Sequence, residues 1–234
     1  MNIYDSLLAT VEQEYDTVKV LKESERSRIS LVRHHASGSR FVLRQFEGCA
    51  EVYKKLLGLS SPHLPRIIEV GEADGRTVVL EEYIMGDTLA FILEGGLLSI
   101  KETRGIMRQL CRGVWGLHSV GAVHRDIKPE NVMLRGDEVV LIDFDASRIY
   151  KHEQETDTQI LGTNGYAAPE QYGLSQSDER ADIYAMGVLL NIMLTGKHPS
   201  KELAAGYMGR IIQRCTMVNP KKRFQNVLQL MEVM

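Results

Sequence analysis

Residues 124–131 are His-Arg-Asp-Ile-Lys-Pro-Glu-Asn, and this stretch is the most informative part of the sequence about the reaction that the chain could catalyse. It places a carboxylate, an ammonium and an amide close together, at Asp126, Lys128 and Asn131. In phosphoryl transfer a carboxylate orients the attacking hydroxyl, an ammonium neutralises the moving phosphoryl group and an amide oxygen holds a metal ion. A second carboxylate, Asp143, ends a short apolar run and is placed to hold the other side of that metal. The stretch therefore predicts a phosphoryl-transfer site.

Two further motifs follow in order, Asp-Phe-Asp at 143–145 and Ala-Pro-Glu at 168–170. A lone His-Arg-Asp would carry little weight, because Asp and Asn often only terminate turns. The three motifs together resemble the H-R-D-L-x-x-x-N, D-F-G and A-P-E signatures of the eukaryotic-type protein kinases, in the bacterial serine/threonine branch. The resemblance covers essentially the whole chain. It implies an α+β, bilobal protein-kinase-like fold, with a small antiparallel β lobe carrying one helix and a larger, mainly helical lobe.

The resemblance also implies roles for the residues of these motifs. Asp126 and Lys128 would be catalytic, and the lysine at this spacing is typical of serine/threonine kinases rather than tyrosine kinases. Asn131 and Asp143 would hold Mg²⁺ or Mn²⁺, since hard cations prefer oxygen ligands. The phosphate donor would be ATP, and the partner a protein substrate that presents Ser or Thr.

The segment between the second and third motifs implies regulatory and docking residues. Arg125 would pair with a phosphorylated residue of this segment, for which Thr156 and Thr158 are the preferred sites, with ordinary loop residues as the alternative. Thr163 looks like the docking threonine that bridges the catalytic Asp and Lys. Autophosphorylation and dimerisation are left open.

Three further parts of the pattern have structural rather than catalytic roles in the family. His124 is expected to pack under Phe144. Glu170 and Arg223 resemble a buried ion pair. Asp182 matches the carboxylate that braces the backbone of the catalytic loop.

The composition is ordinary for a globular protein: 234 residues, 44% hydrophobic, 25% charged and a net charge of −3. This charge does not indicate a nucleic-acid or membrane-surface binder. Three widely spaced cysteines indicate neither a disulfide framework nor a zinc site, and buried free thiols are the default. The chain shows no signal peptide and no run near the roughly 20 apolar residues that a membrane span needs. We therefore expect a cytoplasmic protein.

Near residue 86 the sequence pattern changes from one typical of strands to one typical of helices. We expect an N-lobe at 1–86, with a connector at 82–86, and a C-lobe at 87–234. Periodicity predicts strands at 17–21, 28–34, 40–46, 64–70 and 77–83, and helices at 1–15, 51–59, 101–120, 182–194, 207–215 and 224–234. Trp115 is expected in the core.

The N-lobe departs from the family pattern where phosphates should be held. Lys22, Ser24 and Ser27 stand at glycine positions of the phosphate-binding loop, and side chains there hinder close backbone approach. Serine hydroxyls together with Arg26 or Arg28 would then supply some phosphate contacts, or else the loop is only a charged hairpin tip.

Arg44 replaces the strand lysine and presents a planar fork instead of a compact ammonium. Glu51 is the best candidate for its helix carboxylate, although gapless alignment puts Val52 there instead. Glu81 falls at the gatekeeper position, where a buried carboxylate needs a partner, and Arg44 is one possibility. 

Other positions would line the nucleotide site. Asp145 replaces the glycine of the second motif, either as a spare ligand or as a tolerated substitution. By position in the family pattern, the nucleotide contacts also include Ile29, Val42, Glu82 and Ile84.

Three functions remain open at this point. The first is an ATP-dependent serine/threonine protein kinase of weak or atypical activity. The second is a pseudokinase, a nucleotide- or protein-binding module. The altered N-lobe favours this interpretation, whereas the retained Asp126 and Asp143 argue against it. The third is a small-molecule kinase of the aminoglycoside type, which would lack Lys128 and the docking segment at 162–170.

Overall fold

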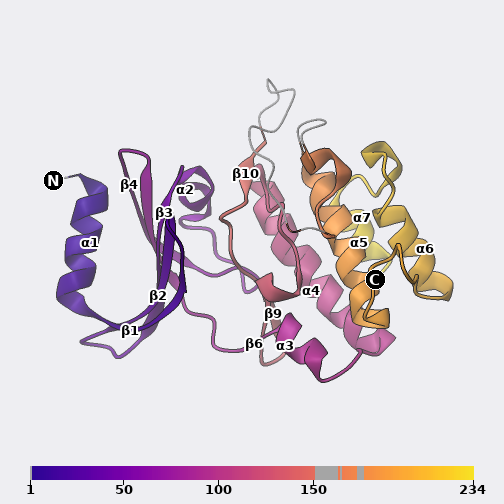
Figure 1. Ribbon diagram of the computed structural model, residues 1–234, viewed down its shortest axis with the longest axis horizontal. Coiled ribbons are helices and arrows are strands. Elements are labelled where there is room, and N and C mark those ends of the chain that lie inside the picture. The colour runs from indigo at the N-terminus through magenta and orange to yellow at the C-terminus, as the bar shows by residue number, and fades with distance from the viewer. Residues whose placement is uncertain (1, 151–162, 164, 173–176) are drawn as a thin grey trace. The chain divides into compact units, whose positions relative to one another are not determined.

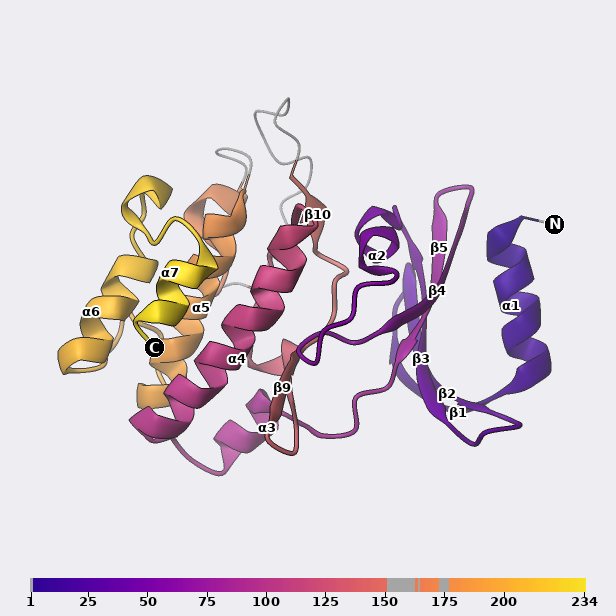
Figure 2. The same ribbon diagram turned by 180° about the vertical axis from the view of Figure 1, so that it is seen from behind.

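The computed structural model describes residues 2–150, 163, 165–172 and 177–234. Contacts divide the chain into two compact units, each of which is considered by itself. Unit 1 comprises Met1–Ser61 and Pro65–Met85, and unit 2 comprises Pro62–Leu64 and Gly86–Met234. Figures 1 and 2 show the elements from opposite sides.

Unit 1 is built on a five-stranded antiparallel sheet in the order β1-β2-β3-β5-β4. The strands are β1 (Tyr15–Glu23), β2 (Ser27–His34), β3 (Arg40–Glu47), β4 (Ile67–Ala73) and β5 (Arg76–Glu82). The five-stranded layout agrees with the pattern of the sequence. The fourth strand begins at Ile67, later than the expected residue 64, and Leu64 itself belongs to the other unit.

Helix α1 (Ile3–Glu14) covers one face of this sheet, as both ribbon views show. Its buried side chains Tyr4, Leu7 and Val11 form one core cluster with Val32, Leu43, Val78 and Leu80 of the strands. Gly71 of β4 permits this contact, since a Cβ there would lie 2.9 Å from the Tyr4 Cα and 3.0 Å from the Ile3 carbonyl oxygen. The sequence predicted the helix but not the face that it covers.

Helix α2 (Glu51–Leu56) lies on the opposite face of the sheet from α1 (Figure 1). The ring of Tyr53 on α2 packs against Phe46 on β3, with centroids 5.7 Å apart. The helix is only six residues long and lacks a side-chain N-cap, so it depends on packing for its stability. The prediction of a helix to residue 59 was therefore too long.

The described part of unit 2 contains five helices, five short strands and three 3₁₀ turns, and the motif residues lie in the loops and 3₁₀ turns between them. The helices are α3 (Leu89–Glu94), α4 (Ile100–Ser119), α5 (Glu179–Thr195), α6 (Gly206–Cys215) and α7 (Val227–Glu232), the strands are β6 (Asp87–Thr88), β7 (Ala122–Val123), β8 (Val132–Arg135), β9 (Glu138–Leu141) and β10 (Arg148–Ile149), and the 3₁₀ turns are η1 (Pro129–Asn131), η2 (Pro169–Tyr172) and η3 (Pro220–Lys222). The predicted last helix, 224–234, is shorter at both ends.

Two long helices form the centre of unit 2. A capping box between Ser99 and Glu102 starts α4, and Asp178 caps α5, which ends at Gly196 in the left-handed conformation. Helix α5 buries most of its circumference, as its apolar run predicts. Within the described ranges, no helix is long and apolar enough to cross a membrane.

Two side-chain predictions were wrong. Trp115 is 42% exposed, because it lies outside the face of α4 that buries Met107, Leu110 and Val114. Cys111 and Cys215 are buried, and burial raises the pKa of the Cys111 thiol to about 12, but Cys49 is exposed.

The segment Pro62–Leu64 lies with unit 2, although the sequence placed it in the first lobe. The backbone carbonyl of His63 accepts a hydrogen bond from the Leu141 N–H at 3.0 Å. The His63 ring also contacts the Val139 carbonyl oxygen at 2.9 Å. Gly113 of α4 leaves room for it, since a Cβ would lie 2.9 Å from the His63 oxygen. These long-range contacts leave no local pattern in the sequence.

Candidate active site

The backbone of the catalytic loop is held in an unfavourable conformation by side chains from distant elements. Arg125 has φ of 69°, in the left-handed region that a bulky residue seldom adopts. Its N–H donates to Asp182 of α5 at 2.8 Å, and its carbonyl accepts from the Gln171 amide at 2.8 Å. Gln171 follows the third motif directly and was missed in the sequence, because an amide in a turn carries no distinctive pattern.

Asp182 is fully buried and accepts three hydrogen bonds. The donors are the His124 N–H at 2.9 Å, the Arg125 N–H at 2.8 Å and the His118 Nε2 at 2.8 Å. Burial acts to raise the pKa of the Asp182 carboxyl, but these donors and the neighbouring imidazoles outweigh it, and the pKa lies below its ordinary value. The carboxylate stays ionised, so it keeps the loop backbone in place.

His124 fixes the loop against the second motif, as expected. Its ring meets Phe144 edge to face, with centroids 5.6 Å apart, and both side chains are buried. Burial lowers the pKa of His124, so the ring is neutral. Its Nδ1 accepts from the Asp126 N–H at 3.3 Å, and its Nε2 donates to the Ile142 carbonyl at 3.2 Å.

Asp126, Lys128 and Thr163 form a closed polar cluster. The Lys128 Nζ lies 2.7 Å from both Asp126 Oδ2 and Thr163 Oγ1. The Thr163 hydroxyl donates to Asp126 Oδ1 at 2.7 Å. Burial acts to raise the pKa of Asp126, but the hydrogen bonds from Lys128 and Thr163 lower it overall. An ionised carboxylate therefore accepts a hydrogen bond from a hydroxyl here, next to an ammonium.

Asn131 and Asp143 offer oxygen atoms to a cation. The Asn131 amide nitrogen donates to the Asp126 carbonyl at 2.9 Å and to Asp126 Oδ2 at 3.0 Å, which leaves the amide oxygen as the end available to a metal. A backbone hydrogen bond from Ile142 to Asn131 sets Asp143 beside it. These oxygen donors fit Mg²⁺, which keeps several waters and takes few protein ligands.

The second motif is bent at its first residue. Asp143, not Asp145, has φ of 69°, and its Oδ1 accepts from the Asp145 N–H at 3.4 Å. Asp145 itself is not in the left-handed region, and its role as a spare ligand or as a tolerated substitution stays a prediction.

The structural ion pair is as expected. Glu170 and Arg223 form two parallel contacts of 2.6 and 2.9 Å, and Arg223 also donates to the carbonyls of Met217, Arg180 and Val218. A buried guanidinium with this many acceptors ties the third motif to α5 and to the turn before α7.

In unit 1, Arg44 and Glu81 form a buried ion pair across neighbouring strands. The Arg44 Nε lies 2.6 Å from Glu81 Oε1, and the two residues are 5% and 3% exposed. This contact confirms one of the partners considered for Arg44. Glu51, the other, begins α2 on the same side of the sheet, and its role stays a prediction.

Strand register places the predicted nucleotide contacts around this pair. Ile29 lies directly opposite Arg44, and Val42 directly opposite Glu81, so all four share the face that α1 does not cover. Glu82 exchanges hydrogen bonds with Arg66, through its N–H and through its carboxylate. Ile84 follows β5 and is buried. Nucleotide contact by these residues stays a prediction.

The turn between β1 and β2 closes on itself. The Ser24 N–H donates to the Ser27 carbonyl at 2.8 Å, and the Ser27 N–H donates to Ser24 Oγ at 3.1 Å. Both backbone donors are thus used within the turn. Arg26 faces Glu47 at 3.6 Å, and Arg28, which faces Glu23 at 3.7 Å, lies on the α1 side of the sheet, away from Arg44. Contact of this turn with phosphate stays a prediction.

A model of the protein kinase domain matches residues 15–232 of the chain. The chain belongs to the protein kinase family. Similar proteins include "Serine/threonine-protein kinase pkn2" of Myxococcus xanthus, 31% identical over 164 residues, which is 65% of this chain and 20% of that protein. "Serine/threonine-protein kinase PknE" of Mycobacterium tuberculosis is 33% identical over 169 residues, 69% of this chain and 30% of that protein. The chain thus spans less than a third of the length of these two relatives.

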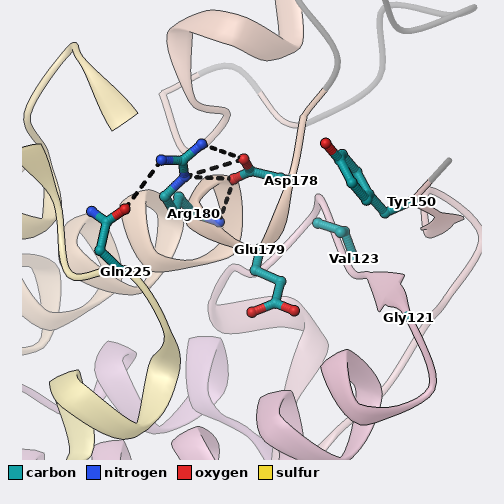
Figure 3. Close-up of a pocket in the computed structure, with 7 residues that line it drawn as sticks. All are labelled: Gly121, Val123, Tyr150, Asp178, Glu179, Arg180 and Gln225. Carbon is teal, nitrogen blue, oxygen red and sulfur yellow. Dashed lines mark hydrogen bonds and ion pairs between the residues drawn. The ribbon is translucent and has the colours of Figure 1, made fainter. Parts of the chain in front are cut away.

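The described part of unit 2 contains a pocket of about 440 Å³ (Figure 3). None of its described lining residues belongs to the three kinase-family motifs. Its walls include Val123, Tyr150 and the first turn of α5. Its arginine, Arg180, is already bound by Asp178 and by Gln225. Thr156 and Thr158, which the sequence analysis predicts as phosphosites, lie outside the described residues.

Proposed function

We propose that this chain is an ATP-dependent serine/threonine protein kinase that transfers the γ-phosphate to Ser and Thr hydroxyls of proteins. The observation that carries the proposal is the cluster of Asp126, Lys128 and Thr163, in which a carboxylate accepts from a hydroxyl at 2.7 Å. The printed names of the relatives, which are serine/threonine-protein kinases, support the same class of acceptor.

Each residue has one task in the proposed reaction. The Asp126 carboxylate accepts a hydrogen bond from the substrate hydroxyl and takes its proton as the oxygen bonds to the γ-phosphorus. The bond between that phosphorus and the β–γ bridging oxygen breaks, and ADP leaves. The Lys128 ammonium offsets negative charge on the transferred group. Thr163, which occupies a hydroxyl position beside Asp126, orients the docking segment.

Asn131 and Asp143 would hold Mg²⁺ or Mn²⁺, which when bound neutralises the phosphate oxygens of ATP. Fixation of the Asn131 amide by Asp126 couples the metal ligand to the catalytic carboxylate. Loss of either side chain is therefore expected to affect nucleotide binding as well as transfer.

Transfer is tested with purified protein, radiolabelled ATP, Mg²⁺ or Mn²⁺ and a generic basic protein. Wild type should label the substrate or itself, whereas Asp126→Asn and Asp143→Asn should not. Asp137→Asn is the matched control, because its side chain is exposed in the turn before β9. If wild type incorporates no more phosphate than the two active-site variants, the chain is not a kinase.

The second candidate is a pseudokinase that signals by conformation. The closed Ser24–Ser27 turn favours it, because the backbone N–H groups of Ser24 and Ser27 both donate within the turn. A thermal-shift titration with ATP separates the candidates. A metal-dependent shift that Asp143→Asn removes, without phosphate transfer, would support a nucleotide-binding pseudokinase.

A further inference from the structure

Three arginines of unit 1 line one hollow of about 270 Å³. Arg26 lies in the turn between β1 and β2, Arg28 follows at the start of β2, and Arg76 begins β5. The fold therefore brings guanidinium groups from distant parts of the sequence to one place. Tyr4 of α1 also lines the hollow, so the hollow lies on the face of the sheet that α1 covers.

Strand register explains why Arg28 and Arg76 share this hollow. Arg28 lies directly opposite Gln45 of β3, and Arg76 lies directly opposite Glu47 of β3. Gln45 and Glu47 are two residues apart, so they and their partners point to the same face of the sheet. Strands β2 and β5 lie on either side of β3, about 10 Å from each other. Two long arginine side chains can span that distance and bind one anion between them.

The ring of Tyr4 fixes the position of Arg76. The guanidinium carbon lies 4.9 Å from the ring centroid, which is the distance of a cation–π contact. Tyr4 is only 7% exposed, so its ring is a rigid support. A guanidinium over a ring keeps the N–H groups in its plane for other acceptors. Among the described residues, no carboxylate forms an ion pair with Arg76.

The other two arginines are held only loosely by nearby carboxylates. The Arg26 Nε lies 3.6 Å from Glu47, and the Arg28 Nε lies 3.7 Å from Glu23, and both distances are too long for a hydrogen bond. All four side chains are more than half exposed, so each contact contributes at most about 1 kcal/mol. An anion with several oxygens can therefore compete for both guanidinium groups.

The size and the charges of the hollow favour one kind of anion. Its volume lies below the roughly 300–1,000 Å³ of pockets that enclose a whole small molecule, so it suits one side chain of a larger partner. A phosphorylated Ser or Thr carries about −1.5 to −2 charges and three acceptor oxygens, which arginine forks bind in two-point contacts. The carboxylates of Glu25 and Glu47, which also line the hollow, would repel a continuous anionic surface such as a membrane.

We propose that the hollow of Arg26, Arg28 and Arg76 binds a phosphorylated Ser or Thr side chain of a partner protein. Ile29 and Val42, two of the predicted nucleotide contacts, lie on the opposite face of the sheet. The inference goes beyond the proposed kinase activity, because binding in this hollow does not require transfer of phosphate by this chain.

Fluorescence anisotropy of a labelled glycine–serine peptide with one phosphoserine tests the proposal on the full chain. The double variant Arg28→Gln with Arg76→Gln should bind the peptide at least about 10-fold more weakly than wild type. The matched control is Arg33→Gln with Arg40→Gln, since these exposed arginines lie directly opposite each other on the other face of the sheet. Equal losses in the two double variants would overturn the proposal, and so would equal binding of the peptide with unmodified serine.

The single variant Arg26→Gln supports the test, because this side chain is 82% exposed and its loss does not disturb the core. It should weaken the phosphopeptide about 3-fold or more, with an unchanged midpoint of thermal unfolding. Unchanged phosphopeptide binding would exclude Arg26 from the site and contradict the three-arginine hollow.

Competition identifies the source of the phosphate. Inorganic phosphate should displace the labelled peptide less effectively than the unlabelled phosphopeptide does, and equal potency would reject a protein partner. Vesicles of phosphatidylserine and phosphatidylcholine should not displace it, and displacement would point to a membrane surface instead.

ATP with Mg²⁺ separates this hollow from the nucleotide site, since Ser24 and Ser27 of the turn also line the hollow. Saturating ATP should leave the phosphopeptide bound, and displacement would reject a separate site. Wild type that binds the phosphopeptide but transfers no phosphate would keep this inference and reject the kinase activity. Wild type that transfers phosphate but does not bind the phosphopeptide would reject this inference alone.

Discussion

The catalytic loop of unit 2 and the sheet of unit 1 hold their charged groups in different ways. In the loop, polar groups have partners from elements far apart in the sequence: the Arg125 backbone N–H donates to Asp182 of α5, and the Asp126 carboxylate accepts from Thr163. In the sheet, the buried charges Arg44 and Glu81 are paired between adjacent strands. The loop therefore depends on elements from across its unit, whereas the contact between Arg44 and Glu81 follows from the register of two adjacent strands.

The first way to break this comparison is Asp182→Asn, which should have the largest effect. The amide would turn an NH₂ toward backbone donors that now bind a carboxylate, at a cost of about 3–5 kcal/mol in the free energy of unfolding. Urea denaturation measures it. Asp178→Asn on the same helix is the control and should cost no more than about 1 kcal/mol, because Asn also caps helices and the Arg180 pair is partly exposed. Equal costs would show that the loop does not depend on Asp182.

Thr163→Val tests the polar cluster with little change in shape. It removes the hydroxyl that accepts from Lys128 and donates to Asp126, so kcat/KM should fall by roughly 100-fold, or about 2.7 kcal/mol. Thr163→Ser should retain most activity. Similar rates for the Val and Ser variants would contradict a role for the hydroxyl.

Gly71→Ala tests the sheet side of the comparison. The added Cβ would lie 2.9 Å from the Tyr4 Cα and 3.0 Å from Val78 Cγ1, so α1 must shift, and we expect a loss of about 2 kcal/mol in stability. Gly105→Ala in α4 meets no atom within 4 Å and should stabilise the protein by up to about 1 kcal/mol. The two substitutions are chemically identical, so opposite signs in thermal unfolding would confirm the close approach of α1. Equal signs would refute it.

The smallest expected effect is the change of the free energy of unfolding with pH near neutrality. The folded-state pKa values of Asp126 and Asp182 lie below the ordinary value of 3.8, so the stability that they contribute is fully present above that pH and is lost as the pH falls through the lowered values. Each carboxylate adds a slope of at most about 1.4 kcal/mol per pH unit in this acid range. Unfolding of wild type and Asp182→Asn between pH 2 and 7 should therefore converge only below about pH 4. Convergence already at pH 6 would show that the carboxyl is protonated in the folded state.

The sequence predicted the parts of the site that depend on short motifs. Asp126, Lys128 and Asn131 lie within a single short motif of the sequence. The contacts of Thr163 and Arg223 were expected from the resemblance to the kinase family. Periodicity also located the five strands, since alternation of buried residues is a local property. The expected burial of the Glu81 carboxylate also predicted that it needs a charged partner, and Arg44 is such a partner.

The remaining features depend on contacts that no local pattern encodes. Gln171 acts through the shape of the turn after the third motif, and the segment 62–64 joins unit 2 through backbone contacts of His63. The lengths of α2 and α7 were overestimated, because apolar spacing continues past the last helical hydrogen bond. The face that α1 covers was invisible in the sequence, since both faces of the sheet carry apolar residues.

The cover that α1 places on the sheet limits how other proteins can approach unit 1. Tyr4, Leu7 and Val11 are buried against the strands, and the Arg76 guanidinium lies 4.9 Å from the centroid of the Tyr4 ring. Displacing these three side chains into water would cost on the order of 6 kcal/mol. That cost corresponds to a loss of more than four powers of ten in affinity for any partner that competes with α1 for this face. Helix α1 thus competes with any partner for this face of the sheet. Removal of the helix would expose the apolar side chains of Val32, Leu43, Val78 and Leu80.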